Sequence, residues 1–478
     1  MKRSIIIVVF LVLCIVAFAD FVEIAPGGKY FEHKDKSLIP LGFNDALPWP
    51  SLSPLLMGDI KAGERYFEKL KEYGVNVLRI MFEYSQDKNN LTAFEDPLGE
   101  RNPIVIETWD RIVNLAEKYD IYLIITPWDP FWGYENWETN PYNIKNEGTI
   151  SSLKYFLTDE KTIENAKNRF KFMIDRYGDS DKILAWELNN EIELWYGRIF
   201  NKPDSVIARE VKNWIKEMSS YIREYEMKKF GQTHLITVST AAPALTGTLA
   251  NILYDQTYLD FVTTHFYYDT IKQYTEPLKI AEDVTMNIRY HNYIFNDSVP
   301  FMDSESGPIN NWPLRADQDV KSYKAFSWSH IASGGTGIGL RWPYTIPHKM
   351  PSYLLDVIKA VRAFVEDNIN WLYFKGVNLD DFTKIECSAD EYFFTNSGNS
   401  VIETTQIIGW VCSNGKELGN VSITFEDLHD GVFSFEAWDT DEGTIFYTNE
   451  YESNEGEITV QLETDKVDFA IKLYEKDE

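Results

Sequence analysis

The stretch Ile183-Leu184-Ala185-Trp186-Glu187-Leu188-Asn189-Asn190-Glu191 combines a strand-length apolar run with acidic residues in its middle and at its end. The apolar run predicts a buried β-strand, and the polar residues after it predict that the strand emerges at a rim. In a barrel of parallel strands, the rim at the carboxyl ends of the strands holds the reacting groups. Glu191, the last residue of the stretch, is therefore the first candidate for a catalytic group.

Similar apolar runs occur on both sides of this stretch and alternate with amphipathic helical segments. We expect strands at residues 38–44, 75–82, 121–128, 183–191, 235–239, 261–267, 300–305 and 340–342. Strands that alternate with helices in this way predict an α/β fold, a (β/α)8 TIM barrel over residues 20–370. A doubly wound sheet is the alternative, and it is disfavoured because no Gly-rich phosphate loop follows the first strand.

The texture of the sequence changes at Trp371. Residues 458–462 alternate between apolar and polar, and Asp441-Glu442-Gly443 and Asn454-Glu455-Gly456 are turn signals. Residues 371–478 are therefore predicted to form an all-β sandwich domain. It could bind polysaccharide or brace the barrel, and the lack of a clear aromatic platform in its sequence favours bracing.

The first residues predict export. Lys2 and Arg3 precede an apolar run, and Ala17-Phe18-Ala19 resembles a cleavage site, so residues 1–19 are predicted to be a signal peptide and the protein to be secreted. A membrane anchor is the alternative, but the run is short for a membrane span. We expect no membrane association after cleavage.

The net charge and the scarcity of cysteine and histidine argue against several classes of partner and cofactor. A formal charge of −28 argues against nucleic acid and anionic membranes as partners, whereas a neutral substrate meets no such repulsion. No spacing of Cys or His indicates a metal site, and we expect no cofactor. Cys387 and Cys412 could form a disulfide or be two buried thiols. The sequence sets no oligomeric state.

Two carboxyl groups stand where glycosidic chemistry needs them. Hydrolysis of a glycosidic bond requires one carboxyl group that donates a proton and a second that acts as nucleophile or activates water. Glu191 closes the fourth predicted strand and Glu305 closes the seventh. Each alone is more simply an exposed loop carboxylate, but the pairing at two strand ends favours catalysis. Glu187 lies deeper in its strand, so we expect it to be paired inside the barrel.

Residues 185–191 resemble the fourth-strand motif of the retaining (β/α)8 glycoside hydrolase clan, and within it they are most similar to the β-mannanases and cellulases of glycoside hydrolase family 5. The resemblance covers about residues 38–368. It implies that Glu191 is the acid/base and Glu305 the nucleophile. The residues expected to bind the substrate are Arg79, Asn190, His265, Tyr267, Trp342, Trp128 and Asn44.

Physical roles accompany several of these assignments. Arg79 is a cation in an apolar strand, and it needs an anionic neighbour such as Glu305 because burying an unpaired charge is costly. His265 and Tyr267 lie on one strand face by the period-two rule, and Tyr267 could orient Glu305 by hydrogen bonding. Trp342 and Trp128 offer flat faces on which a sugar ring could stack.

The expected activity is that of a secreted retaining O-glycosyl hydrolase. It would cleave β-linked polysaccharide or oligosaccharide of the mannan or glucan type by double displacement, as an endo-β-1,4-mannanase or an endoglucanase. Two alternatives use the same features. One is a non-catalytic carbohydrate-binding protein on a barrel scaffold, and the other is a transglycosylase in which a sugar replaces water.

Overall fold

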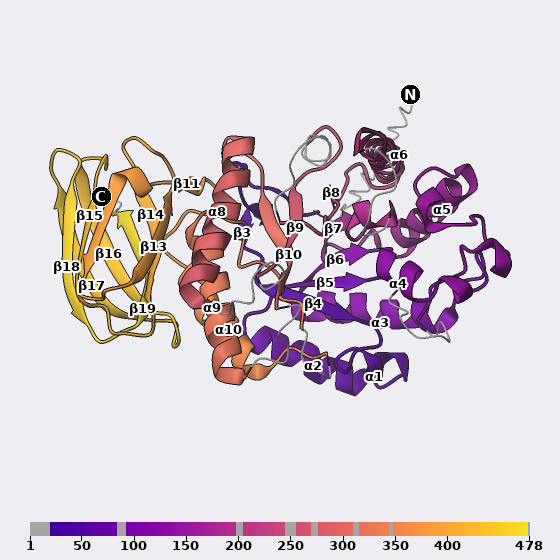
Figure 1. Ribbon diagram of the computed structural model, residues 1–478, viewed down its shortest axis with the longest axis horizontal. Helices are drawn as coiled ribbons and strands as arrows, with labels where there is room; N and C mark the ends of the chain where they lie inside the picture. The colour runs from indigo at the N-terminus through magenta and orange to yellow at the C-terminus, as the bar shows by residue number, and fades with distance from the viewer. Residues whose placement is uncertain are drawn as a thin grey trace, which may run out of the picture.

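The structure is a computed structural model that describes residues 20–83, 92–196, 204–243, 255–268, 276–308, 315–343 and 348–476. The predicted signal peptide, residues 1–19, lies outside the described residues. Figure 1 shows parallel strands surrounded by helices at one end of the molecule and a β-rich region at the other. Helices α8 (Pro277–Phe295), α9 (Ala316–Ala332) and α10 (Ser352–Val365) stand between the two.

The helical part is built on two groups of parallel strands. The first group is a sheet in the order β4 (Gly42–Ala46), β5 (Val77–Met81), β6 (Tyr122–Thr126), β7 (Ile183–Glu187) and β8 (Leu235–Thr237). The second is the pair β9 (Val262–Tyr267) and β10 (Phe301–Gly307). Strands β4 to β7 are buried at every residue, which explains why their sequences are runs of apolar residues rather than alternating ones.

Hydrogen bonds join the two groups at both of their edges. At one edge, the Asp260 N–H donates to the Ile236 carbonyl at 2.9 Å. At the other, Arg341 forms isolated parallel bridges to Phe43 in β4 and to Ser306 in β10. The predicted eighth strand is thus a single bridging residue in place of a full strand. Pro343 follows two residues later and has no N–H for a ladder.

The first predicted strand, 38–44, is divided in the structure. Its start belongs to a small antiparallel sheet of β1 (Glu23–Ile24), β2 (Phe31–His33) and β3 (Lys36–Leu38), and its end belongs to β4. Pro40 lies between them and lacks the N–H that a continuous strand needs. Phe31 and Leu38 of the small sheet pack against Val77 and other residues that begin the parallel strands, so this sheet closes the amino-terminal end.

The remaining helices surround the parallel strands. They are α1 (Ser53–Leu56), α2 (Ile60–Glu72), α3 (Pro103–Tyr119), α4 (Pro130–Glu135), α5 (Glu160–Tyr177) and α6 (Asp204–Phe230), with short 3-10 turns η1 (Trp137–Thr139), η2 (Ile144–Asn146), η3 (Leu153–Tyr155) and η4 (Ile192–Tyr196). A further 3-10 turn, η5 (Asp380–Phe382), belongs to the β-rich region. Several of the helices begin after an Asp or Asn whose side chain caps the first turn. The Asp159 carboxylate caps α5 by accepting from the Thr162 N–H. No helix in the described ranges is long and apolar enough to span a membrane.

The β-rich region contains two antiparallel sheets. Its strands are β11 (Val377–Asn378), β12 (Thr383–Cys387), β13 (Tyr392–Gly398), β14 (Gln406–Ser413), β15 (Gly419–Phe425), β16 (Gly431–Asp439), β17 (Thr444–Ser453), β18 (Ile458–Thr464) and β19 (Asp468–Glu475). Six of them pair in the order β11-β13-β14-β19-β16-β17, and three in the order β12-β15-β18. An apolar core that includes Ile423, Phe435 and Val460 lies between the sheets. Cys387 and Cys412 are free thiols.

The six-stranded sheet also packs on the helices α8, α9 and α10. In β14, Ile407 and Val411 contribute to the core between the sheets, whereas Trp410 faces the helices and joins the other core. Trp438 makes an edge contact with Phe364 of α10, with ring centroids 5.6 Å apart. The strands β14, β16 and β19 of this sheet are therefore largely buried, whereas the edge strand β17 is mostly exposed.

An ion pair fixes this contact. The Lys324 ammonium of α9, whose side chain is 8% exposed, lies 2.6 Å from the Asp441 carboxylate and 3.0 Å from that of Asp468. Removing a cation leaves a buried carboxylate without compensation. We expect Lys324→Met to lower the free energy of unfolding by about 2 kcal/mol, measured as a shift in the urea midpoint. Lys321→Met, on an exposed position of the same helix, is the control, and equal midpoints for both variants would contradict the role of the pair.

Candidate active site

Hydrogen bonds to neighbouring segments hold the residues that follow β7. The Asn190 N–H donates to the Trp128 carbonyl at 3.1 Å, and the Glu191 N–H donates to the Ser239 hydroxyl at 3.1 Å. Glu191 itself has a φ of +41°, a left-handed conformation that is unusual for a residue with a side chain. Strained backbone of this kind persists only where surrounding contacts determine it. The rim position of Glu191 is therefore set by the segments that follow β6 and β8.

Arg79 of β5 lies at the centre of the site, and its side chain is fully buried. Its guanidinium donates twice to Glu187, at 2.5 and 2.8 Å, and once to Glu305 at 2.7 Å. Two further hydrogen bonds of 2.8 Å reach the side-chain oxygens of Asn44 and Asn190. These contacts use all the N–H donors that a guanidinium has. Arg79 therefore fixes its neighbours and has no donor left for a substrate.

The expected pairing of Glu187 inside the barrel is confirmed. Burial opposes ionisation, but the charge and hydrogen bonds of Arg79 outweigh it and bring the pKa of Glu187 below its ordinary value. The Thr126 hydroxyl adds a hydrogen bond to the same carboxylate at 2.8 Å. Glu187 is consequently the permanent counter-ion of Arg79.

Glu305 reaches the site because β10 contains a bulge. The register against β9 shifts between Asp303 and Glu305, so that Asp303 lies opposite Thr264 and Glu305 lies opposite His265. Strict alternation would put both acidic residues on one face. Instead, the Asp303 carboxylate accepts from Thr264 at 2.7 Å and from Asn287 of α8, on the helix side, while Glu305 points to Arg79. The bulge thus selects which carboxylate enters the site.

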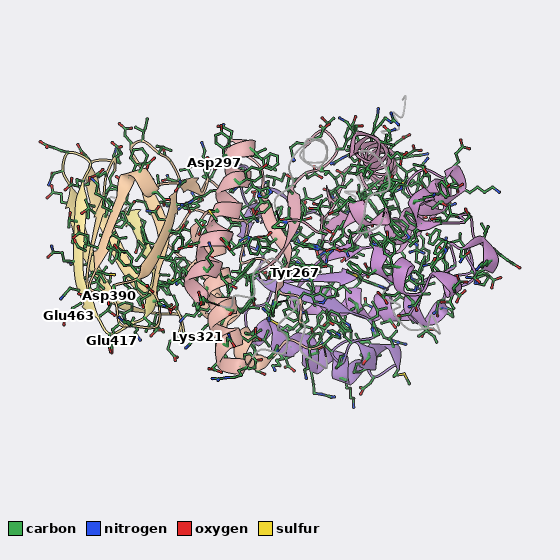
Figure 2. The ribbon with its side chains drawn as sticks, in the orientation of Figure 1. Tyr267, Asp297, Lys321, Asp390, Glu417 and Glu463 are labelled. Atoms are coloured by element: carbon green, nitrogen blue, oxygen red, sulfur yellow. The ribbon has the colours of Figure 1, made fainter. Side chains whose placement is uncertain are left out.

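Tyr267 and His265 bracket the two candidate carboxylates. The Tyr267 hydroxyl donates to Glu305, as the sequence predicts, and Figure 2 shows Tyr267 between the pair β9–β10 and the sheet β4–β8. His265 Nδ1 lies 2.7 Å from Glu191 Oε1 and 3.4 Å from Glu305 Oε2. Burial lowers the pKa of His265 to about 4, so its imidazole is neutral at physiological pH. It can share a proton with Glu191 without adding charge.

Glu191, His265 and Glu305 each offer a ligand atom, and these atoms all lie within 4.8 Å of one another. Such a group could hold a metal ion. However, the Arg79 cation already contacts Glu305, and it would repel a second positive charge there. Burial, followed by the charge of Glu191, raises the pKa of Glu305 although Arg79 and Tyr267 act in the opposite direction.

Two further buried carboxyl groups, which were not predicted from the sequence, lie near Glu191. Burial raises the pKa of Asp129 to about 7, and its carboxylate accepts from Asn190 at 3.2 Å. Burial, with the charge of Glu191, raises the pKa of Glu193 to about 8, and Glu193 accepts from the Ala241 N–H at 2.7 Å. The Asp129-Pro130 pair could have been recognised as a helix N-cap, because Asp129 caps α4.

Three expected substrate-binding residues have other roles. Arg79 is saturated by protein acceptors, as described above. The Asn44 side chain is also used internally, because its amide donates to the Ser304 carbonyl at 2.9 Å and its oxygen accepts from Arg79. The prediction of an exposed stacking face is wrong for Trp128. Its ring is 1% exposed, packs on Phe170 and hydrogen-bonds to Tyr142 at 3.0 Å.

Trp342 lies beside the site. It belongs to an apolar cluster with Trp49 and Met81, and Tyr267 packs against this cluster. Its backbone N–H donates to the Ser306 carbonyl at 2.9 Å, which ties it to the strand of Glu305. Gly307, which follows Ser306 in β10, has a φ of +134°, and a Cβ there would lie 3.1 Å from the Arg341 guanidinium. Both the backbone conformation and the close approach of Arg341 therefore favour glycine at this position.

Unfolding measurements can test whether the stability of the fold depends on all the hydrogen bonds that the Arg79 guanidinium donates. In Arg79→Lys the charge remains, but an ammonium has three donors and cannot satisfy four buried acceptor side chains. We expect a loss of about 3 kcal/mol or more in the free energy of unfolding by urea. Arg176→Lys is the matched control, since Arg176 makes two hydrogen bonds to Asp110 on the surface. It should lose less than about 1 kcal/mol, and a similar loss in both variants would refute the central role of Arg79.

The chain is similar to known proteins in sequence and in fold. The "Probable mannan endo-1,4-beta-mannosidase C" of Aspergillus terreus is 32% identical over 138 residues, which are 28% of this chain and 32% of that protein. The chain therefore spans about a third of the length of this relative. A glycoside hydrolase family 5 structure from Bacteroides vulgatus superposes with a TM-score of 0.62 at 13% identity, covering 95% of this chain and 93% of the other.

An endo-1,4-β-D-mannanase structure from Thermotoga petrophila superposes with a TM-score of 0.50 at 20% identity, covering 68% of this chain and all of the other. At these identities the likeness concerns the fold. The family model "Cellulase (glycosyl hydrolase family 5)" matches residues 44–332, which is more than half of the chain and includes both Glu191 and Glu305. The chain belongs to glycosyl hydrolase family 5.

Proposed function

We propose that this protein is a secreted retaining glycoside hydrolase that cleaves β-1,4-linked mannan or a related β-glucan. The observation that carries the proposal is the convergence of Glu191 and Glu305, whose oxygens lie within 4.8 Å of each other. Carboxyl groups about 5–5.5 Å apart are typical of retaining enzymes, whereas inverting enzymes need about 6.5–9.5 Å. The preference for mannan follows the name of the Aspergillus terreus relative, a probable mannan endo-1,4-beta-mannosidase.

The proposed reaction has two steps. The Glu305 carboxylate attacks the anomeric carbon while Glu191 donates its proton to the glycosidic oxygen, so that the bond to the leaving sugar breaks and a glycosyl ester forms. Glu191, now ionised, then takes a proton from water, and the water oxygen attacks the same carbon and releases Glu305. Two inversions give net retention. A sugar hydroxyl in place of water would give transglycosylation.

The surrounding residues fit these roles. Arg79 and Tyr267 hold both oxygens of Glu305 and orient it for attack. His265 contacts Glu191 and stays neutral, so it can hold the acid in position in either protonation state. Asn190 retains an N–H that Asp129 does not use, and Trp342 lies on the side of Tyr267. We propose that these two groups meet the sugar.

The hydrogen bonds at both edges of the parallel strands support a closed eight-stranded barrel over residues 20–370. The two antiparallel sheets of residues 371–478 would brace it, since Trp410 and Trp438 of the larger sheet pack in the same core as helix α10. The charged start and apolar run of residues 1–19 support export.

Glu305→Ala tests the nucleophile. Without the Glu305 carboxylate, kcat on an aryl β-mannoside should fall by about 10⁴-fold or more. Added azide should act as the nucleophile in its place, restore part of the turnover and give the α-glycosyl azide. Glu224→Ala, an exposed carboxylate of α6, is the control and should keep its activity. Full activity of Glu305→Ala would exclude the mechanism. A panel of mannan, glucomannan, β-glucan and xylan separates an enzyme from a protein that only binds carbohydrate.

Glu193→Gln tests the carboxyl groups around the acid. Burial, with the charge of ionised Glu191, raises the pKa of Glu193 to about 8, so Glu193 is still neutral when Glu191 loses its proton. Gln copies this neutral form and cannot ionise. We therefore expect both limbs of the kcat/KM profile to stay in place in Glu193→Gln. A shifted alkaline limb would show instead that Glu193 is already ionised when Glu191 titrates.

A further inference from the structure

A cationic hollow lies at the amino-terminal end of the parallel strands, opposite the rim of Glu191. Its volume is about 780 Å³. The small sheet β1–β3, the residues just before β5, β6 and β7, and helix α10 all contribute to its wall. The hollow is thus separate from the site described above, and the proposed hydrolysis does not use it.

The charge of the wall is opposite to that of the chain. Its cationic residues are Lys34, Lys36, Lys71, Lys182, Lys359 and Arg362, against the carboxylates of Glu72, Asp120 and Glu366. The whole chain carries a formal charge of −28. A surplus of cations in one concave place is therefore a local feature of the fold.

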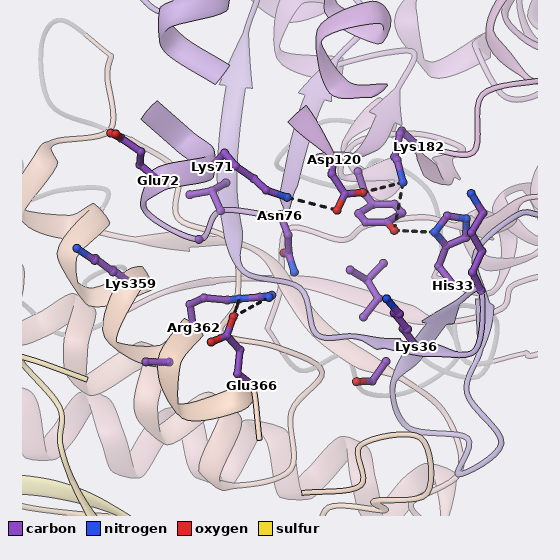
Figure 3. Close-up of a pocket in the computed structure, with 17 residues that line it drawn as sticks. His33, Lys36, Lys71, Glu72, Asn76, Asp120, Lys182, Lys359, Arg362 and Glu366 are labelled. Carbon is purple, nitrogen blue, oxygen red and sulfur yellow. Dashed lines mark hydrogen bonds and ion pairs between the residues drawn. The ribbon is translucent and has the colours of Figure 1, made fainter. Parts of the chain in front are cut away.

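Part of this positive charge is already neutralised. The Lys34 ammonium lies 2.5 Å from the Asp181 carboxylate. Lys182 and Lys71 share Asp120, at 2.8 and 3.3 Å. Figure 3 shows this shared carboxylate at one side of the hollow. Because Asp181 and Asp120 compensate them, these three lysines contribute little net charge to a ligand.

Three other cations remain available. Lys36 and Lys359 have no carboxylate within 4.0 Å among the residues that the structure describes. Among the described residues, the ion-pair partner of Arg362 is Glu366, one helical turn away at 3.0 Å, and these side chains are 42% and 52% exposed. An exposed pair of this kind is weak and can rearrange. Figure 3 shows Lys36 and Arg362 reaching the hollow from opposite sides.

The backbone leaves room for Arg362. Gly74 follows α2 with a φ of +74°, and a Cβ there would lie 2.5 Å from Cγ of Arg362. The aliphatic stem of Arg362 therefore lies directly over the glycine. Any larger residue at position 74 would displace the guanidinium from the hollow.

We propose that this hollow binds the phosphate group of a small molecule. A tetrahedral dianion offers acceptors in several directions, which suits cations on opposite walls of the hollow. Lys36 of β3 lies on one wall, and Lys359 and the guanidinium fork of Arg362, both of α10, lie on the other. The volume is within the range of small-molecule sites and far exceeds that of one water-sized ion. A sugar phosphate fits it as well as free phosphate. The acidity of the rest of the chain argues against a nucleic acid.

Calorimetric titration of the full chain with inorganic phosphate, glucose 6-phosphate and glucose tests this proposal, at about 0.15 M salt to screen nonspecific attraction. The variant Arg362→Gln removes the fork. Lys36→Gln combined with Lys359→Gln removes two exposed charges and leaves the packed wall intact. Lys161→Gln, on the exposed first turn of α5 outside the hollow, is the control.

We expect a phosphate-bearing ligand to bind and glucose not to bind. The affinity should fall by about tenfold or more in each hollow variant and stay unchanged in Lys161→Gln. Tighter binding of glucose 6-phosphate would identify a phosphate ester as the ligand, and binding of inorganic phosphate alone would identify the free ion. Absence of binding by both phosphates, or equal affinities in all variants, would overturn the proposal.

Discussion

The contact of Arg79 with Glu187, Glu305, Asn44 and Asn190 is the interaction on which the rest of the site depends. A buried guanidinium is tolerated only if its charge and its donors are compensated, and here every donor is used. The acceptors come from β4, β7 and β10 and from the residue before Glu191. One side chain therefore ties together three strands that are distant in sequence, and it fixes the nucleophile candidate and the neighbour of the acid candidate in the same step.

The bulge in β10 is the second constraint, and it acts on the backbone. Without the register shift after Asp303, Glu305 would share a face with Asp303 and point at the helices, where Thr264 and Asn287 hold the latter. Arg79 would then lose one of its two anionic partners. The bulge in β10 and the ion pair with Arg79 thus both direct Glu305 into the site.

The order of the parallel strands and most of the site residues could be predicted from the sequence, because a strand that is buried on both faces consists of a run of apolar residues. A charged residue inside such a run must have a partner, so it could be predicted that Arg79 needs an anionic neighbour and that Glu187 is paired. That Arg79 and Glu187 pair with each other is visible only in the structure. The single-residue bridge at Arg341 and the internal roles of Asn44 and Trp128 could not be predicted either. They depend on which neighbours fill the space around a side chain, and residue type alone does not carry that information.

The buried carboxyl groups around the site differ in how Arg79 reaches them. Glu187 receives two of its N–H groups, and its pKa is lowered despite burial. Glu305 receives one, and its pKa is raised because burial and the charge of Glu191 outweigh that single contact. Glu193 receives no N–H from Arg79, and burial, with the charge of Glu191, raises its pKa to about 8. The donors of a single cation thus separate Glu187, a structural anion, from Glu193, which can exchange a proton near neutral pH. Acid and base chemistry on one scaffold requires such differences in pKa.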